Sequence, residues 1–177
     1  KISKKPINYK NAIKTLENRV KDVISEKKPE LIWILKHPPV YTAGIGYNKN
    51  DVIDKNIKII KTNRGGKITY HGPGQLIFYV VINLNQRKKD IRWFIKVLEK
   101  TIIKTLKHYN INSFSNEKNV GIWIKHDKKQ KKIAAIGVKI KRWVAYHGFS
   151  LNLNVDLKKY SKIVPCGLDN KKIINLK

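Results

Sequence analysis

The chain has 177 residues, 41% of them hydrophobic, which is enough to form one globular domain with a core and excludes an intrinsically disordered class. A formal net charge of +27 would ordinarily indicate a nucleic-acid partner, but the excess is almost entirely lysine and runs through every segment. Arginine, whose planar fork binds phosphate, is scarce. We therefore expect acidic protein partners and no specific nucleic acid.

The sequence carries no sign of membrane insertion or secretion. Its longest continuous apolar run, residues 76–82, is far too short to cross a bilayer, and the N-terminal residues lack the apolar core of a signal peptide. Cys166 is the single cysteine, which excludes an internal disulfide and a multi-cysteine metal site. We expect a cytoplasmic protein with one free thiol and no metal.

The first half of the chain is predicted to form one helix followed by strands. Apolar residues at helical spacing predict an amphipathic helix over residues 8–28, and residues 31–35 form a short apolar run typical of a buried strand. Pro38 and Pro39 end that strand because proline cannot donate to the ladder, and a loop is expected after them. Further strands are predicted over residues 57–60 and 76–84.

The second half begins with another amphipathic helix and continues as strands. Asp90 is the expected N-cap of a helix that ends near Asn110. Because most later strands are joined as hairpins, we expect an α+β fold with a largely antiparallel or mixed sheet, in one domain covering residues 1–177. The later strands are predicted over residues 120–124, 133–140, 143–146 and 149–155.

Residues 64–75, Arg-Gly-Gly-Lys-Ile-Thr-Tyr-His-Gly-Pro-Gly-Gln, concentrate glycine between two predicted strands. Gly65 and Gly66 allow a positive φ or a close approach of a ligand, and residues 72–74 have the composition of a rigid turn without side-chain bulk. Such a segment can form the wall of a narrow pocket. The commoner role of these glycine pairs is an ordinary turn, and composition alone favours that alternative.

A short motif occurs twice. Residues 70–72 and residues 146–148 both read Tyr-His-Gly, and each is expected to open a strand. Chance is one explanation of the repeat. If the repeat is not chance, His71 and His147 enter strands of one sheet and face the same cavity. For either histidine alone, a hydrogen-bonded structural role is the more common one.

Cys166 lies between Pro165 and Gly167, which predicts a thiol presented on a tight loop rather than within a strand. This is a usable position for a nucleophile, although free cysteines are also among the residues most often buried and inert. A reactive thiol requires a neighbouring cation. Lysines are too numerous for spacing alone to choose one.

Four motifs, in order and at comparable spacing, resemble the octanoyltransferases of lipoate biosynthesis. They are residues 64–75, Lys-Ile-Ala-Ala-Ile-Gly at 132–137 followed by Val138, His-Gly-Phe-Ser-Leu-Asn at 147–152, and Val-Pro-Cys-Gly at 164–167. Residues 37–42 also resemble this family, and the resemblance covers nearly the whole chain. The resemblance implies a biotin/lipoate protein ligase-like α+β fold, with a larger and a smaller sheet flanked by helices.

The resemblance also implies a site. Cys166 and Lys132 match the catalytic dyad of the family. The positions that match its substrate-binding residues are Arg64, Gly65, Gly66, Lys67, Ile68, Thr69, Tyr70, His71, Ala135, Ile136, Gly137, Gly148, Phe149 and Ser150. The implied reaction moves an octanoyl or lipoyl group from acyl carrier protein to a lysine ε-amine through a cysteine thioester, with no ATP and no other cofactor.

The implied partners are acyl carrier protein, the lipoyl domains of 2-oxoacid dehydrogenase complexes and the glycine cleavage H protein, and a monomer is expected. Two alternatives remain open from sequence. One is an ATP-dependent lipoate or biotin protein ligase, and the other is a nonenzymatic basic nucleic-acid-binding protein. The chain ends soon after Cys166, at Lys177. We expect the family to continue beyond this point, so that a C-terminal part is missing.

Overall fold

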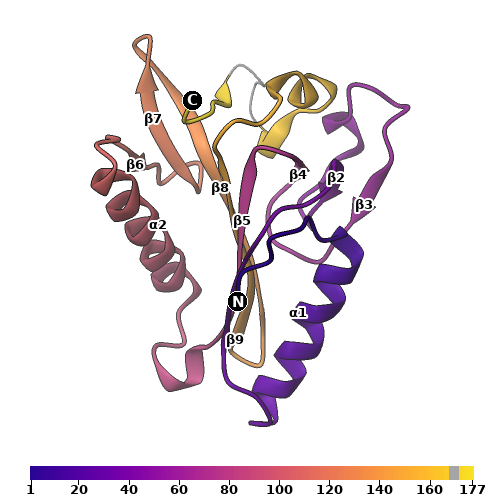
Figure 1. Ribbon diagram of the computed structural model, residues 1–177, viewed down its shortest axis with the longest axis vertical. Coiled ribbons are helices and arrows are strands. Elements are labelled where there is room, and N and C mark those ends of the chain that lie inside the picture. Colours follow the sequence, from indigo (N-terminus) through magenta and orange to yellow (C-terminus); the bar gives the residue numbers. More distant parts are fainter. Residues whose placement is uncertain (168–171) are drawn as a thin grey trace.

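A computed structural model of the chain describes residues 1–167 and 172–177. A six-stranded antiparallel sheet forms its centre, in the order β1-β5-β9-β8-β7-β6, and a three-stranded sheet lies beside it, in the order β3-β2-β4. Figure 1 shows helix α1 on one side of the large sheet and helix α2 on the other. The expected α+β fold with a larger and a smaller sheet is confirmed. The large sheet consists of β1 (Leu31–Leu35), β5 (Gln75–Asn83), β6 (Phe114–Ser115), β7 (Ile122–His126), β8 (Lys129–Lys141) and β9 (Val144–Asn152).

Helix α1 (Tyr9–Ile24) covers one face of the large sheet. The Asn8 side chain accepts from the N–H groups of Lys10 and Asn11 and so caps the helix. Its buried stripe packs on the large sheet, where Trp33 and Val81 belong to the same core. The helix is shorter than predicted because Ser25 caps it and Glu26 takes φ 56°, which breaks the helical backbone.

Helix α2 (Ile91–His108) covers the opposite face. The Asp90 side chain accepts from Trp93 N–H at 2.9 Å, which confirms the predicted N-cap. Phe94 and Leu98 pack against Val80 on β5, whose side chain points away from those that contact α1. Within the described residues, neither helix is long and apolar enough to cross a membrane.

The small sheet contains two strands that sequence reasoning missed. Its members are β3 (Ile59–Lys61), β2 (Val40–Ala43) and β4 (Ile68–His71). β2 lies where a loop was expected, and β4 lies inside the glycine-rich stretch, where turns were expected. β4 pairs antiparallel with β2, and β2 pairs parallel with β3. The glycine-rich stretch is therefore a loop followed by a strand and a turn.

The later strands differ from the prediction at two places, and the first is the two-residue strand β6, which was not predicted. The two strands predicted over 143–146 and 149–155 form a single strand, β9, which pairs with β5 and β8 along its length. His147 (φ 70°) and Gly148 (φ 153°) lie inside it. His71 ends β4 rather than opening β5. The expectation that each histidine-glycine pair opens a strand is therefore wrong. β7 and β8 are joined by a tight turn with positive φ at Asp127 and Lys128.

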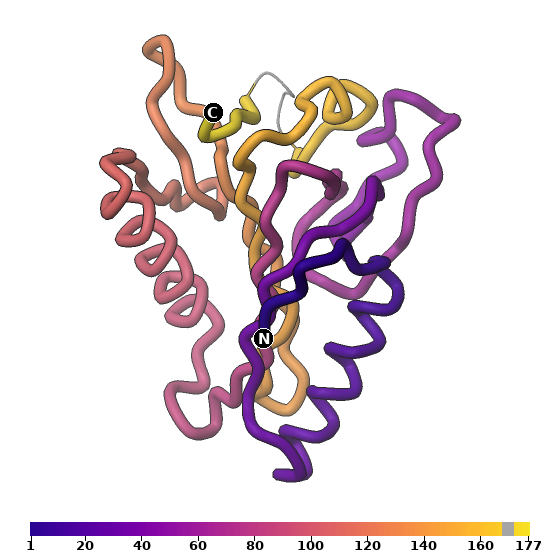
Figure 2. Tube along the Cα trace, viewed as in Figure 1, coloured from indigo at the N-terminus to yellow at the C-terminus, as the bar shows by residue number. Residues whose placement is uncertain are grey.

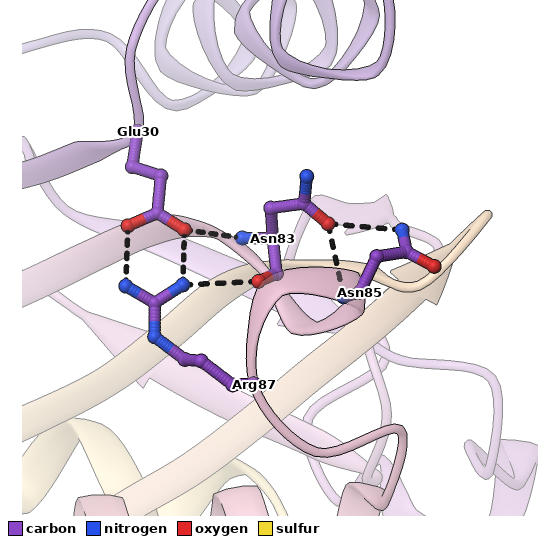
Figure 3. A network of polar contacts seen from close by, with 4 residues as sticks. All are labelled: Glu30, Asn83, Asn85 and Arg87. Carbon is purple, nitrogen blue, oxygen red and sulfur yellow. Dashed lines mark hydrogen bonds and ion pairs between the residues drawn. The ribbon is translucent and has the colours of Figure 1, made fainter.

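Two polar connections hold the ends of the large sheet. Glu30, just before β1, forms a bidentate pair with Arg87 and accepts from the backbone N–H of Asn83 at 2.6 Å (Figure 3). The second connection is the C-terminal segment, residues 172–177, which returns to β8 in Figure 2. The N–H of Ile174 donates to the carbonyl of Lys132 at 3.1 Å. The Asn175 side chain bonds both backbone groups of Val155.

Candidate active site

One cavity of about 530 Å³ collects most of the residues that the sequence placed in the site. Of the predicted positions it is lined by Cys166, Lys132, Arg64, Gly65, Gly66, Lys67, Thr69, His71, Ala135, Ile136, Gly137, Gly148, Phe149 and Ser150. Ile68 and Tyr70 do not line it. They belong to a separate core cluster under the small sheet, because alternate side chains of a strand point to opposite faces.

The floor of the cavity is formed by β8 and β9. Ala135 pairs with Ser150 and Gly137 pairs with Gly148, so two of the predicted segments lie directly opposite each other. A Cβ atom on Gly148 would lie 2.0 Å from the carbonyl oxygen of Phe78 on the neighbouring strand. Position 148 therefore requires glycine for the close approach of two backbones, as well as for its positive φ.

The glycine-rich loop lies across this floor. Gly65 N–H donates to Val138 O on β8 at 3.1 Å. The guanidinium of Arg64 is 9% exposed and donates to both oxygens of Thr42 at 2.9 Å, which ties the loop to β2. A Cβ atom on Gly137 would lie 3.0 Å from Gly65 O and 3.4 Å from Arg64 Cδ. Glycines on both segments allow the loop to reach the sheet.

His71 borders the cavity as a neutral ring. Its Nδ1 lies 2.7 Å from Gln75 Oε1. Because the Gln75 amide nitrogen donates to Asn152 and Tyr160, its oxygen faces the histidine, so His71 Nδ1 is the donor. Burial, followed by the charge of His37, lowers the pKa of His71 to about 3. This leaves Nε2 as a hydrogen-bond acceptor.

His147 borders the same cavity, although the two histidines lie in different sheets, on β4 and β9, and not in one sheet as expected. Its Nε2 lies 2.9 Å from Asn63 Oδ1, and the Asn63 amide donates to Glu17 Oε1 at 3.0 Å. This chain of contacts makes Nε2 the protonated nitrogen. Burial, followed by the charges of Arg64 and Lys139, lowers the pKa of His147 to about 3. Both histidines therefore remain uncharged at neutral pH.

Lys132 places an amine in the cavity from β8. Its side chain is 4% exposed, its Nζ donates to Val120 O at 2.9 Å, and the amine lies 5.0 Å from the centre of the Trp123 ring. Burial lowers the pKa of Lys132, while the charges of Cys166 and Glu99 act in the opposite direction. A lysine whose pKa is lowered by burial gives up its proton more readily than an exposed one.

Cys166 lies in the short turn Pro165–Gly167 and has φ 56° and ψ 20°. This confirms the predicted tight loop. The thiol residue is partly exposed and lines the cavity together with Lys132. A Cβ atom on Gly167 would lie 2.7 Å from Lys67 Nζ. A second ammonium group, on the glycine-rich loop, therefore lies against the turn that carries the thiol.

Several residues of the site were not predicted. Ile91 and Ile95 of α2 line the cavity, as do Tyr9 and Tyr79. Glu99 is buried next to it at 8% exposure. A signal for Glu99 exists in the sequence, because it lies four residues after Ile95 and three before Ile102, on the apolar stripe of its helix. A charged residue at such a position indicates a buried partner.

The comparisons with known proteins agree with this geometry. Residues 8–177 match the lipoyl protein ligase A/B catalytic domain family. Among solved structures, lipoate-protein ligase A bound with ATP superposes with a TM-score of 0.66 at 17% identity, over 88% of this chain and 68% of that one. The putative lipoate protein ligase Ta0514 from T. acidophilum also reaches 0.66, at 16% identity, over 90% and 69%. The superpositions show the shared fold, and the family match makes the chain a lipoyl protein ligase A/B catalytic domain.

Closer relatives narrow the family. The chain is 44% identical over 177 residues to an octanoyltransferase from Wolbachia sp. subsp. Brugia malayi, covering 99% of this chain and 86% of that relative. It is also 44% identical to an octanoyltransferase from Ehrlichia chaffeensis, covering 100% and 84%. The chain therefore belongs to the octanoyltransferases, enzymes of lipoyl and octanoyl transfer.

Proposed function

We propose that the protein moves an octanoyl or lipoyl group from acyl carrier protein to a lysine of lipoyl domains through a thioester on Cys166. The observation that carries the proposal is that the single thiol of the chain and the buried amine of Lys132 line one cavity. Residues 1–177 act as a single catalytic domain in this proposal.

The first half-reaction loads the thiol. Lys132, whose pKa is lowered by burial, takes the proton of Cys166. The thiolate attacks the carbonyl carbon of the donor thioester, a new C–S bond forms on Cys166, and the C–S bond to the carrier breaks. The carrier thiolate leaves and receives the proton from Lys132. One thioester replaces another, so the free-energy change of this step is close to zero.

The second half-reaction forms the amide. The neutral ε-amine of the acceptor lysine attacks the acyl carbon, the C–N bond forms and the C–S bond to Cys166 breaks. The amine loses one proton, which passes to Lys132 and then to the Cys166 thiolate. The donor is already activated as a thioester, so this route uses neither ATP nor another cofactor, and no metal.

The walls of the cavity fit an acyl chain. Ile136 and Phe149 of the floor and Ile91 and Ile95 of α2 give it apolar lining. Each methylene of an octanoyl group that such walls remove from water contributes about 0.8 kcal/mol. The glycines at 65, 66 and 137 line the cavity without side chains, and Gly137 lets the glycine-rich loop lie close to β8.

The positive charge of the chain supports an acidic protein as the acyl donor. A net charge of +27 attracts acidic proteins, which suits an acidic acyl carrier protein as donor. The acceptors in the proposal are lipoyl domains of 2-oxoacid dehydrogenase complexes and the glycine cleavage H protein. We further propose that the enzyme acts as a monomer in the cytoplasm, where a free thiol such as Cys166 stays reduced.

Mass spectrometry after mixing with octanoylated acyl carrier protein, without ATP, tests the proposal. We expect one octanoyl adduct, removed by hydroxylamine and located on Cys166, which disappears in Cys166→Ser. Addition of a lipoyl domain should discharge the adduct and leave an octanoyl amide on the acceptor. Absence of the adduct, or transfer that requires ATP and survives Cys166→Ser, would instead favour an adenylating ligase.

A further inference from the structure

Glu99 is a buried carboxylate on α2 that the proposed reaction does not use. It is 8% exposed and lies among the apolar residues that pack this helix onto the sheet. Its Oε1 accepts from the backbone N–H of Gly121 at 3.4 Å. A buried carboxylate requires such a partner, because removing its charge from water is costly.

The same peptide group contacts Lys132 through its other end. The N–H of Gly121 faces Glu99, and the carbonyl of Val120, in the same peptide unit, accepts from Lys132 Nζ at 2.9 Å. One peptide therefore lies between a carboxylate and an ammonium, with its dipole aligned so that each hydrogen bond strengthens the other. A carboxylate on the N–H side makes the carbonyl a better acceptor for the ammonium.

Gly121 allows this arrangement. Its φ is 134°, and a Cβ atom there would lie 3.2 Å from Lys132 Cε, 3.3 Å from Lys132 Nζ and 2.6 Å from Ala134 O. Any side chain at this position would press on the lysine that the peptide holds. The close approach of Gly121 keeps the lysine amine directly against the peptide that Glu99 binds.

We propose that Glu99 is a positioning residue for Lys132: through the Val120–Gly121 peptide it fixes the amine in the cavity that Cys166 also lines, and it favours the ammonium form of that amine. The inference rests on the proposed role of Lys132 as the proton carrier of Cys166. Its geometry, a carboxylate, a peptide and an amine in sequence, comes from three separate elements: α2, the segment before β7, and β8.

Charges of both signs surround Lys132. Two anionic groups, the Glu99 carboxylate and the Cys166 thiolate, raise its pKa against the effect of burial. The Trp123 ring of β7 faces the amine as a weaker partner. Lys67 and Lys118 line the same cavity from its exposed rim and disfavour a further positive charge. Without Glu99, the Cys166 thiolate is the remaining one of these two anionic groups.

The test is a pair of charge-removing variants. Glu99→Gln keeps an oxygen acceptor for Gly121 N–H and removes the charge. Glu117→Gln makes the same change in charge at an exposed residue of the 116–119 turn. The pKa of Lys132 is read by nuclear magnetic resonance on protein with 13C-labelled lysine, using the signal that Lys132→Arg removes. This readout needs no substrate.

We expect Glu99→Gln to lower the Lys132 pKa by about one unit, the lower end of the effect of a nearby opposite charge, and Glu117→Gln to leave it unchanged. In acyl transfer, the ascending limb of the pH profile should move to lower pH by the same amount. An unchanged Lys132 pKa in Glu99→Gln would overturn the inference and leave Glu99 a packing residue. A shift equal to that in Glu117→Gln would do the same.

Glu99→Ala separates position from charge. It removes the acceptor as well, so we expect a Lys132 pKa like that of Glu99→Gln but at least a tenfold lower rate of Cys166 acylation at high pH. Equal rates for the two variants would contradict the positioning role. Circular dichroism checks the fold, and if Glu99→Ala unfolds, Glu99→Gln decides. A shifted Lys132 pKa without any acyl adduct in the unaltered enzyme would refute the proposed function alone.

Discussion

Two histidines and one lysine that line the cavity are buried and have lowered pKa values. His71 and His147 have pKa values of about 3, so they are neutral throughout the range in which the enzyme would act. Lys132 is the titratable cation of the proposed dyad, and burial lowers its pKa. We infer that the pH dependence of acyl transfer reports the dyad, while the histidines supply fixed hydrogen-bond acceptors.

Replacing Lys132 with arginine tests the base directly. Arginine keeps the positive charge but does not give up its proton in proteins, so the rate of Cys166 acylation should fall about 100-fold. The measurement is a single-turnover assay with octanoylated carrier protein. Lys131→Arg, next to His126 on the adjoining hairpin, is the matched control and should retain the full rate. An active Lys132→Arg enzyme would exclude Lys132 as the base.

The two histidines also predict how stability depends on pH. Their ordinary pKa of 6.5 applies in the unfolded chain, and about 3 applies in the folded one. Between these values the unfolded chain binds more protons, so stability falls as pH falls from 6.5 towards 3. Each histidine should remove about 2 kcal/mol from the free energy of unfolding between pH 6.5 and pH 5.

Urea denaturation at pH 7 and pH 5 measures this loss. His147→Asn should remove the part of the histidine-linked difference that this ring contributes and leave the part of His71 and His37, because asparagine tolerates the positive φ at this position and does not titrate. Exposed His108→Asn is the control and should leave the difference as it is. The same loss of stability in His147→Asn as in the unaltered chain would show that this ring is not protected from protons.

Among the elements, the sequence predicted those that are determined by residues close together in the chain. Both helices and their caps follow from apolar spacing and from Asn8 and Asp90. β2 and β4 were missed because each has four residues and is stabilised by pairing with a strand distant in sequence. The unbroken β9 was missed because glycine inside a strand ordinarily indicates an interruption, whereas Gly148 serves a close approach to Phe78.

Gly137→Val tests the slot formed by β8 and the glycine-rich loop. Valine suits a strand, but its Cβ would meet Gly65 O at 3.0 Å and so push the loop from the sheet. We expect octanoyl loading to fall at least tenfold while alkylation of Cys166 by iodoacetamide keeps its rate. Ile140→Val, further along β8 and outside the cavity, is the control. Normal loading of Gly137→Val would show that the acyl group lies elsewhere.

For the molecule as a whole, the sequence predicted the α+β class and brought Cys166, Lys132 and the glycine-rich loop into one site through a resemblance across nearly the whole chain. Composition could not have done so. The two residues of the proposed dyad come from a β-strand and a short turn that are far apart in sequence, and the cavity that both line exists only after the two sheets pack together. For Glu99 the sequence does carry a signal, its place on the apolar stripe of α2, but its partner, the N–H of Gly121, lies near it only after folding.

The charge of the whole molecule predicts a salt effect that depends on the donor. Attraction between a chain of net charge +27 and an acidic carrier is screened by salt. Raising ionic strength should therefore reduce kcat/KM for octanoylated carrier protein about tenfold or more, and should leave the reaction with uncharged octanoyl-pantetheine nearly constant. Equal salt dependence for both donors would show that salt acts on the chemistry in the cavity and not on the association of the enzyme with the carrier protein.

The bond from Ile174 N–H to Lys132 O has a kinetic consequence. It joins the backbone of the proposed base to the segment that follows the nucleophile, while Val164 N–H, just before Cys166, is held at 2.8 Å by Asp51 O. Local opening of residues 172–177 would break the bond to Lys132 O, so hydrogen exchange at Ile174 should report how often the backbone of the proposed base loses this partner.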